Sequence, residues 1–127
     1  MLKKIIIEIV PHNDQRYATV GDWFYDKDGT IKIRVSNMGN WRYEAAVVVH
    51  ELVEFLTCWS AGVKQEDVDD FDMEFEGRRE LGDLSEPGDD PRAPYVRQHC
   101  FATGIERLLV SELGLAWREY EATIDAL

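Results

Sequence analysis

The sequence WRYEAAVVVHELVEFLTCWS, residues 41–60, decides the fold that we expect for this chain. Its apolar residues recur at helical spacing and wrap most of the circumference, which is typical of a helix buried among other elements. Asn40 is a suitable N-cap for this helix, and Gly62 can close its C-terminus. We therefore predict a central helix against which the other elements pack.

Strand signals precede this helix. Residues 3–10 (KKIIIEIV) are rich in isoleucine and predict a buried strand. Residues 22–25 and 30–36 flank an Asp28-Gly29 turn signal, and residues 30–36 alternate apolar and polar side chains, which predicts a hairpin with one buried face. We expect these three strands to form a small antiparallel sheet packed on the central helix.

Helices are expected after the central one. The pattern predicts a short helix around residues 68–76, a loop over 82–94, a long helix over 94–113 and a C-terminal helix over 117–126. Strands followed by helices predict an α+β fold. The length of 127 residues suits a single domain, residues 1–127.

The negative charge of the chain is concentrated in residues 66–90, named here the acidic segment. This segment holds 12 acidic and two basic residues, whereas the rest of the chain holds 13 acidic and 12 basic ones. The total net charge of −11 argues against nucleic-acid binding, which depends on Lys and Arg, and against anionic membranes. No apolar run approaches the ~18–20 residues of a membrane helix.

A cytoplasmic location is expected from two features. Glu8 interrupts the short apolar stretch at the start of the chain, which therefore does not fit a signal peptide. The two cysteines, Cys58 and Cys100, are too few for a disulfide framework and are typical of reduced intracellular thiols.

The central helix carries the motif His50-Glu51-Leu52-Val53-Glu54. Helix positions i and i+4 differ by about 40° in azimuth and one turn in height, so His50 and Glu54 can reach one metal ion. Glu51 lies about 100° round the helix from His50, where its carboxylate could hold a metal-bound water. Imidazole and carboxylate are both zinc ligands, so the motif predicts a zinc site.

A purely structural interpretation of the motif stays open. His50 could make a core hydrogen bond while Glu51 and Glu54 face the solvent. However, two carboxylates and an imidazole in so apolar a helix would be costly to bury without partners. A metal ion would offset that cost.

Residues 23–59 resemble the zincin metallopeptidases, in which a hairpin leads into a buried helix with the motif HExxH. The resemblance implies that the helix supplies two metal ligands and a general base, here Glu51. It also implies a third ligand from a later segment and a peptide substrate lying along residues 30–36. This chain has Glu54 in place of the second histidine, and no HxxGxxH extension follows.

His99 is the predicted third ligand, because it lies in the second long helix, on a stretch apolar enough to pack against the first. A half-buried structural histidine is the alternative for this position. Cys58, one turn beyond Glu54, could replace it or join it, although an inert buried thiol fits its apolar neighbours better. Cys100 is expected to be structural, and His12 is a weaker candidate on a loop.

Two functions follow from these features. The first is a zinc-dependent hydrolase, most simply a small peptidase acting on a peptide or protein substrate, with Glu51 as general base. The second is a non-catalytic protein, such as a phage or bacterial accessory protein, whose acidic segment occupies a basic protein partner and whose metal site, if any, is structural. Salt-sensitive binding to a basic partner would favour the second.

Overall fold

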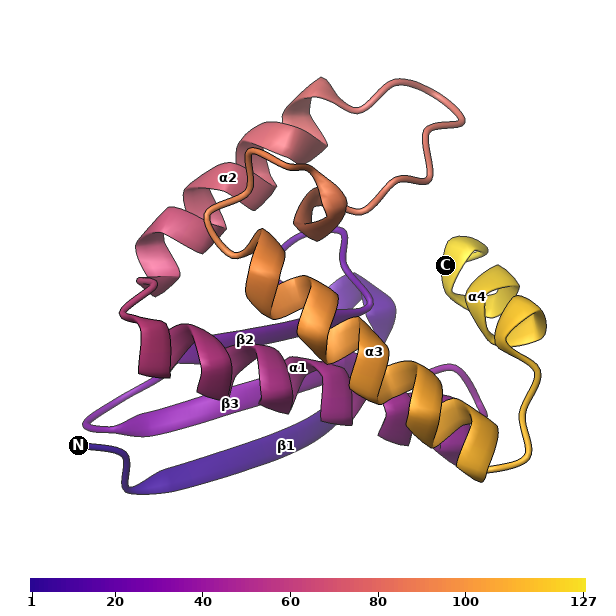
Figure 1. The fold of residues 1–127 in the computed structure, drawn as a ribbon, viewed down its shortest axis with the longest axis horizontal. Helices are drawn as coiled ribbons and strands as arrows, with labels where there is room; N and C mark the ends of the chain where they lie inside the picture. The colour runs from indigo at the N-terminus through magenta and orange to yellow at the C-terminus, as the bar shows by residue number, and fades with distance from the viewer.

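A three-stranded sheet covers one side of the central helix, and a second long helix crosses the other side (Figure 1). The computed structural model describes all 127 residues. The strands are β1 (Lys4–Val10), β2 (Gly21–Tyr25) and β3 (Thr30–Ser36). The helices are α1 (Trp41–Ala61), α2 (Gln65–Arg78), α3 (Val96–Glu112) and α4 (Trp117–Asp125), with short 3-10 turns at His12–Asp14 and Pro87–Asp89. The predicted α+β fold is confirmed.

The central helix α1 has the ends that its sequence predicts. The Asn40 side chain accepts hydrogen bonds from the backbone N–H groups of Arg42 and Tyr43, which would otherwise lack partners inside the helix. At the other end, Gly62 adopts the left-handed conformation with φ of 75°. These caps fix the start and end of the helix that carries the motif.

The sheet is mixed, and the expectation of an antiparallel sheet is wrong for one pair of strands. Strand β2 pairs with β3 in the predicted antiparallel hairpin, but β1 pairs with β3 in parallel. The order is β1-β3-β2, because residues 11–20 carry the chain past the central position to the far edge. The hairpin then returns β3 alongside β1, in the same direction as β1.

Strand β1 is also less buried than its isoleucines predict. Ile5, Ile7 and Ile9 are 36–49% exposed, although they project from the same side of the sheet as the buried residues of β3. Helix α1 packs over β2 and β3 and leaves the edge strand uncovered. Burial of an apolar strand thus depends on the helix above it, which the strand sequence does not reveal.

The core lies between α1, the sheet and α3. Its buried apolar residues come from every layer: Trp23, Ile31, Ile33, Val35, Val47, Phe55, Tyr95, Val110 and Tyr120. No helix is long and apolar enough to cross a bilayer. Helix α2 and the loop after it, which contain the acidic segment, lie beyond the N-terminal end of α3 in Figure 1.

Candidate metal centre

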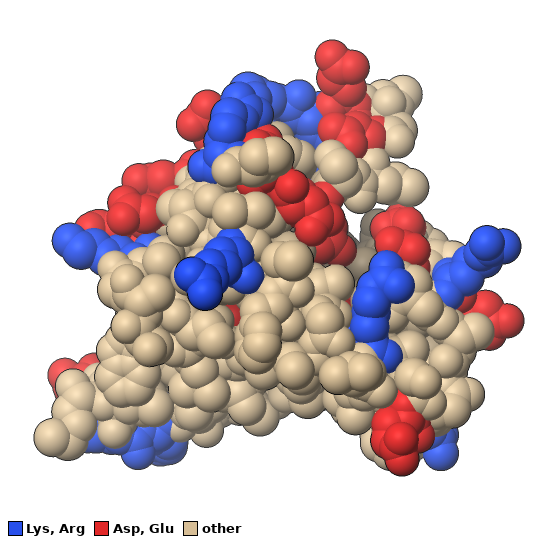
Figure 2. Space-filling view, viewed as in Figure 1, with Lys and Arg blue, Asp and Glu red and all other residues tan.

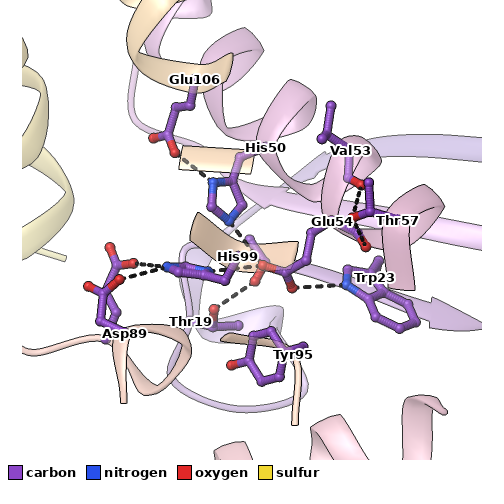
Figure 3. Close-up of polar contacts among 12 residues, drawn as sticks. Thr19, Trp23, His50, Val53, Glu54, Thr57, Asp89, Tyr95, His99 and Glu106 are labelled. Atoms are coloured by element: carbon purple, nitrogen blue, oxygen red, sulfur yellow. Dashed lines mark hydrogen bonds and ion pairs between the residues drawn. The ribbon is translucent and has the colours of Figure 1, made fainter. Parts of the chain in front are cut away.

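Three ligand-type side chains predicted from the sequence meet in the core. The Oε2 atom of Glu54 lies 3.1 Å from Nε2 of His50 and 3.0 Å from Nδ1 of His99 (Figure 3). All three residues are buried, and their donor atoms lie within 4.8 Å of one another. Two imidazole nitrogens and one carboxylate oxygen are the donor set that zinc accepts.

Two helices bring these side chains together. His50 and Glu54 are one turn apart on α1, whereas His99 comes from α3, which packs across α1. The indole N–H of Trp23, on β2, donates to Oε1 of Glu54 over 3.1 Å. This bond holds the carboxylate so that its other oxygen faces the two histidines.

A buried carboxylate supports the far side of His50. Nδ1 of His50 donates to Oε1 of Glu106 over 2.6 Å, and the Tyr120 hydroxyl donates to Oε2 of Glu106 over 2.5 Å. Ligand histidines in metal proteins characteristically donate their second ring N–H to a carboxylate, which fixes the tautomer and the ring orientation. His50 has this arrangement, with Nε2 left to face Glu54.

Two carboxylates also lie on the far side of His99, at ion-pair distance but without the geometry of a hydrogen bond to Nε2. Its Nε2 lies 3.0 Å from Glu86 and 3.3 Å from Asp89, while its Nδ1 faces Glu54. Gly88 lies directly against the imidazole, and a Cβ there would overlap the ring. Glu86, Asp89 and His99 form a second possible ligand group, but both carboxylates are exposed, and exposed acidic groups are common without an ion.

The ionisation of the cluster reflects these contacts. Burial disfavours the charged forms, but hydrogen bonds from His50 and His99 outweigh it and lower the pKa of Glu54 to about 2. Burial would likewise lower the pKa of His99, yet Glu54 and Glu86 raise it to about 10. The cluster therefore contains a buried carboxylate that requires positive charge beside it, whether from protons or from a metal ion.

Glu51, the predicted general base, lies beside the cluster and is not part of the ligand group. It lines a pocket of about 310 Å³ together with His50, Glu54 and His99. The side chain is 91% buried, and no donor hydrogen-bonds to its carboxylate. Burial and then the charge of Glu54 raise its pKa well above the ordinary value. Its carboxylate packs against Gly21, where a Cβ would lie 2.6 Å from Oε1.

The other sequence candidates lie outside the cluster. Cys58 is fully buried, and burial followed by the charges of Glu54 and Glu51 raises the pKa of its thiol to about 12, which suits an inert core residue. Cys100 is exposed. His12 bonds to the hydroxyl of Ser36 over 2.8 Å.

The acidic segment is not simply a solvated surface. Asp72, on α2, is buried and accepts hydrogen bonds from the hydroxyls of Tyr17 and Tyr95. Glu86 and Asp89 turn toward His99. In Figure 2 acidic side chains gather around the hollow between the loop after α2 and helix α3. The segment thus supplies groups to the site as well as charge to the surface.

Glu106, Glu86 and Asp89 were not expected from the sequence. Glu106 follows His99 by seven residues, which places both on one face of α3, so helical periodicity offered a signal for it. Glu86 and Asp89 lie in an irregular loop whose path no periodicity describes.

Comparison with protein-family models, curated proteins and solved structures finds no match to this chain.

Proposed function

We propose that this protein is a zinc-dependent hydrolase in which His50, Glu54 and His99 bind the ion and Glu51 is the general base. The observation that supports the proposal is that three donor atoms converge, and that a further side chain contacts each of the three residues on the side away from the cluster. His50 rests on Glu106, His99 rests on Glu86 and Asp89, and Trp23 holds Glu54. Such outer partners are typical of metal sites.

The proposed chemistry divides between the ion and the protein. When bound, zinc would lower the pKa of a coordinated water to about 7 and polarise a substrate carbonyl. Glu51 faces the pocket, so it can accept the proton of the attacking water and return it to the leaving amine. A dication nearby would also counter the effects of burial and of Glu54, which otherwise raise the pKa of Glu51.

The pocket favours a substrate with positive charge. Among its lining residues Arg79 is the only lysine or arginine, against nine acidic residues: Asp22, Glu51, Glu54, Asp72, Glu76, Asp83, Glu86, Glu106 and Asp125. Several of these carboxylates are buried and already paired, but Asp83, Glu86 and Asp125 are exposed at the pocket. Peptides rich in Lys or Arg are therefore the first substrates to test.

The test combines metal content and turnover on the same samples. The wild-type protein should purify with close to one zinc per chain, and the His50→Ala and His99→Ala variants should lose most of it. Glu51→Gln should keep its zinc and its melting temperature, but lose about 10²–10⁴-fold in peptide hydrolysis. Glu54→Gln is the matched comparison, because it should weaken zinc binding instead.

The outcomes separate the two functions drawn from the sequence. A protein that binds no zinc, and gains no thermal stability from added zinc, would end the metal proposal. Zinc binding without cleavage of any peptide in a library would reduce the site to a structural one. Loss of zinc in Glu51→Gln would show that the ligand assignment is wrong.

A further inference from the structure

A largely uncharged surface, interrupted by a few Lys and Arg side chains, extends over β1, α1 and the adjoining side of α3 (Figure 2). We name it the apolar face and define it by six half-exposed side chains, 36–69% exposed: Ile5, Ile7, Ile9, Leu56, Phe101 and Leu108. Contiguous exposed apolar patches of this kind mark binding surfaces in soluble proteins. The apolar face takes no part in the proposed metal chemistry.

The edge strand β1 is the most informative part of this face. Its register places Ile5, Ile7 and Ile9 beside Ile31, Ile33 and Val35 of β3. The three β3 residues are completely buried, whereas the three isoleucines remain uncovered on the same side of the sheet. One edge of β1 also has no neighbouring strand. A long apolar edge strand is an aggregation hazard unless another chain covers it.

We propose that β1 pairs with β1 of a second copy of this chain, antiparallel about a two-fold axis at Ile7. In this register Ile7 faces Ile7 of the other copy, and Ile5 faces Ile9 in both directions. The spacing Ile-x-Ile-x-Ile is the same read from either end, so one surface is complementary to itself, as a two-fold interface requires. The two three-stranded sheets would join into one of six strands.

The distribution of charge agrees with a second copy as the partner. Each chain carries a net charge of −11, so two copies repel each other unless their acidic surfaces stay apart. Helix α2 and its loop lie at the end of the molecule away from β1 in Figure 1, and acidic side chains gather there in Figure 2. Pairing through β1 places these regions at opposite ends and leaves both metal-site pockets open.

The exposed side chains of the apolar face supply more than half of the area that a standard dimer interface needs. With roughly 150–200 Å² for each large apolar side chain, the exposed parts of the apolar face amount to roughly 500 Å². A standard interface buries ~800 Å² per partner, and homodimer interfaces are more apolar than others. The backbone of the edge strand and the half-buried residues beside it supply the remainder.

The oligomeric state of the purified protein tests the proposal. Sedimentation equilibrium at micromolar concentration should give twice the chain mass for the wild type and the single-chain mass for Ile7→Lys. Leu81→Lys is the matched control, because Leu81 is fully exposed in the loop after α2 and should leave the dimer intact. A monomeric wild type, as expected for a face that binds a different protein or a lipid, would overturn the proposal. So would a dimer that Ile7→Lys leaves unchanged.

Cysteine cross-linking tests the register. In a Cys100→Ser background, which removes the exposed native thiol, Ile7→Cys should form a disulfide-linked dimer under mild oxidation. Lys4→Cys should not, because residue 4 faces residue 10 of the other copy in this register. Efficient cross-linking at residue 4 and none at residue 7 would refute the two-fold pairing at Ile7. Zinc content is measured on the same samples, so that failure of the dimer and failure of the proposed metal site can be told apart.

Discussion

The substitution Glu106→Gln isolates the carboxylate behind His50. Glu106 accepts the Nδ1–H of His50 at 2.6 Å and the Tyr120 hydroxyl at 2.5 Å, and all three residues are buried. Glutamine keeps the size of the side chain and one acceptor oxygen but removes the charge. The imidazole then becomes a weaker and less firmly oriented ligand, while the three proposed ligands themselves stay unchanged.

We expect zinc affinity to fall by about 10–100-fold, which corresponds to about 1.4–2.7 kcal/mol. The upper end is favoured because Glu106 is only 7% exposed, and a charged hydrogen bond is stronger where water is excluded. The assay is a competition titration against a chromophoric zinc chelator at constant pH. Glu112→Gln, an exposed substitution on the same helix, is the control and should bind zinc as the wild type does.

Equal zinc affinities of Glu106→Gln and Glu112→Gln would show that Glu106 does not support His50 as a ligand. Thermal unfolding of both variants without metal checks that a loss of zinc affinity does not come from loss of the fold. A Glu106→Gln protein that is unfolded in the absence of zinc would require Glu106→Asp, which keeps the charge and shortens the reach, as the second comparison. Glu106→Asp should retain a higher zinc affinity than a protein in which no carboxylate supports His50.

Three further predictions concern the surroundings of the cluster. Gly88→Ala places a methyl group against the His99 ring, so we expect at least a tenfold loss of zinc affinity and a loss of about 1–3 kcal/mol of stability. Gly104→Ala on α3 is the control, because its methyl group meets open space and should be neutral or stabilising. Equal effects of the two substitutions in chelator titration and urea unfolding would contradict this prediction. Cys58→Ala should leave zinc content unchanged by elemental analysis, and loss of the metal would make this thiol a ligand. Burial raises the pKa of Asp72 to about 7, so the folded protein holds a proton that the unfolded chain releases near pH 4, and this contribution is lost as the pH rises toward 7. In urea unfolding of the metal-free proteins at pH 5 and pH 8, the wild type should lose up to ~2.7 kcal/mol more than Asp72→Asn, because about two pH units of the shift lie above pH 5, and identical losses would refute the shift.

The local elements of this protein were predictable from local signals. The central helix, its Asn40 cap and the Gly62 end follow from spacing and capping chemistry that act within a few residues. The hairpin follows from the Asp28-Gly29 turn, where both residues adopt positive φ. The helix over the acidic segment is longer than predicted, Gln65–Arg78 rather than residues 68–76, because helix ends depend on weak contacts.

The candidate site was predictable only in part. The i, i+4 spacing of the motif determines that His50 and Glu54 share one face of α1, since helix geometry fixes it. The apolar surroundings of His99 led us to expect it near His50 and Glu54. The contact between His99 and Glu54 forms because α3 packs across α1. The sequence did not specify which carboxylates would support the two imidazoles.

The pairing of distant segments was decided by tertiary structure alone. The parallel match of β1 with β3 and the exposure of its isoleucines depend on where α1 lies over the sheet, which no strand sequence encodes. The approach of the loop at Glu86 and Asp89 to His99 likewise depends on chain packing. Spacing along the chain determines which side chains share a face of one element, because local geometry is nearly fixed. The burial of apolar surface over the whole molecule decides which faces meet, because this free energy depends on the complete fold and not on any short stretch of sequence.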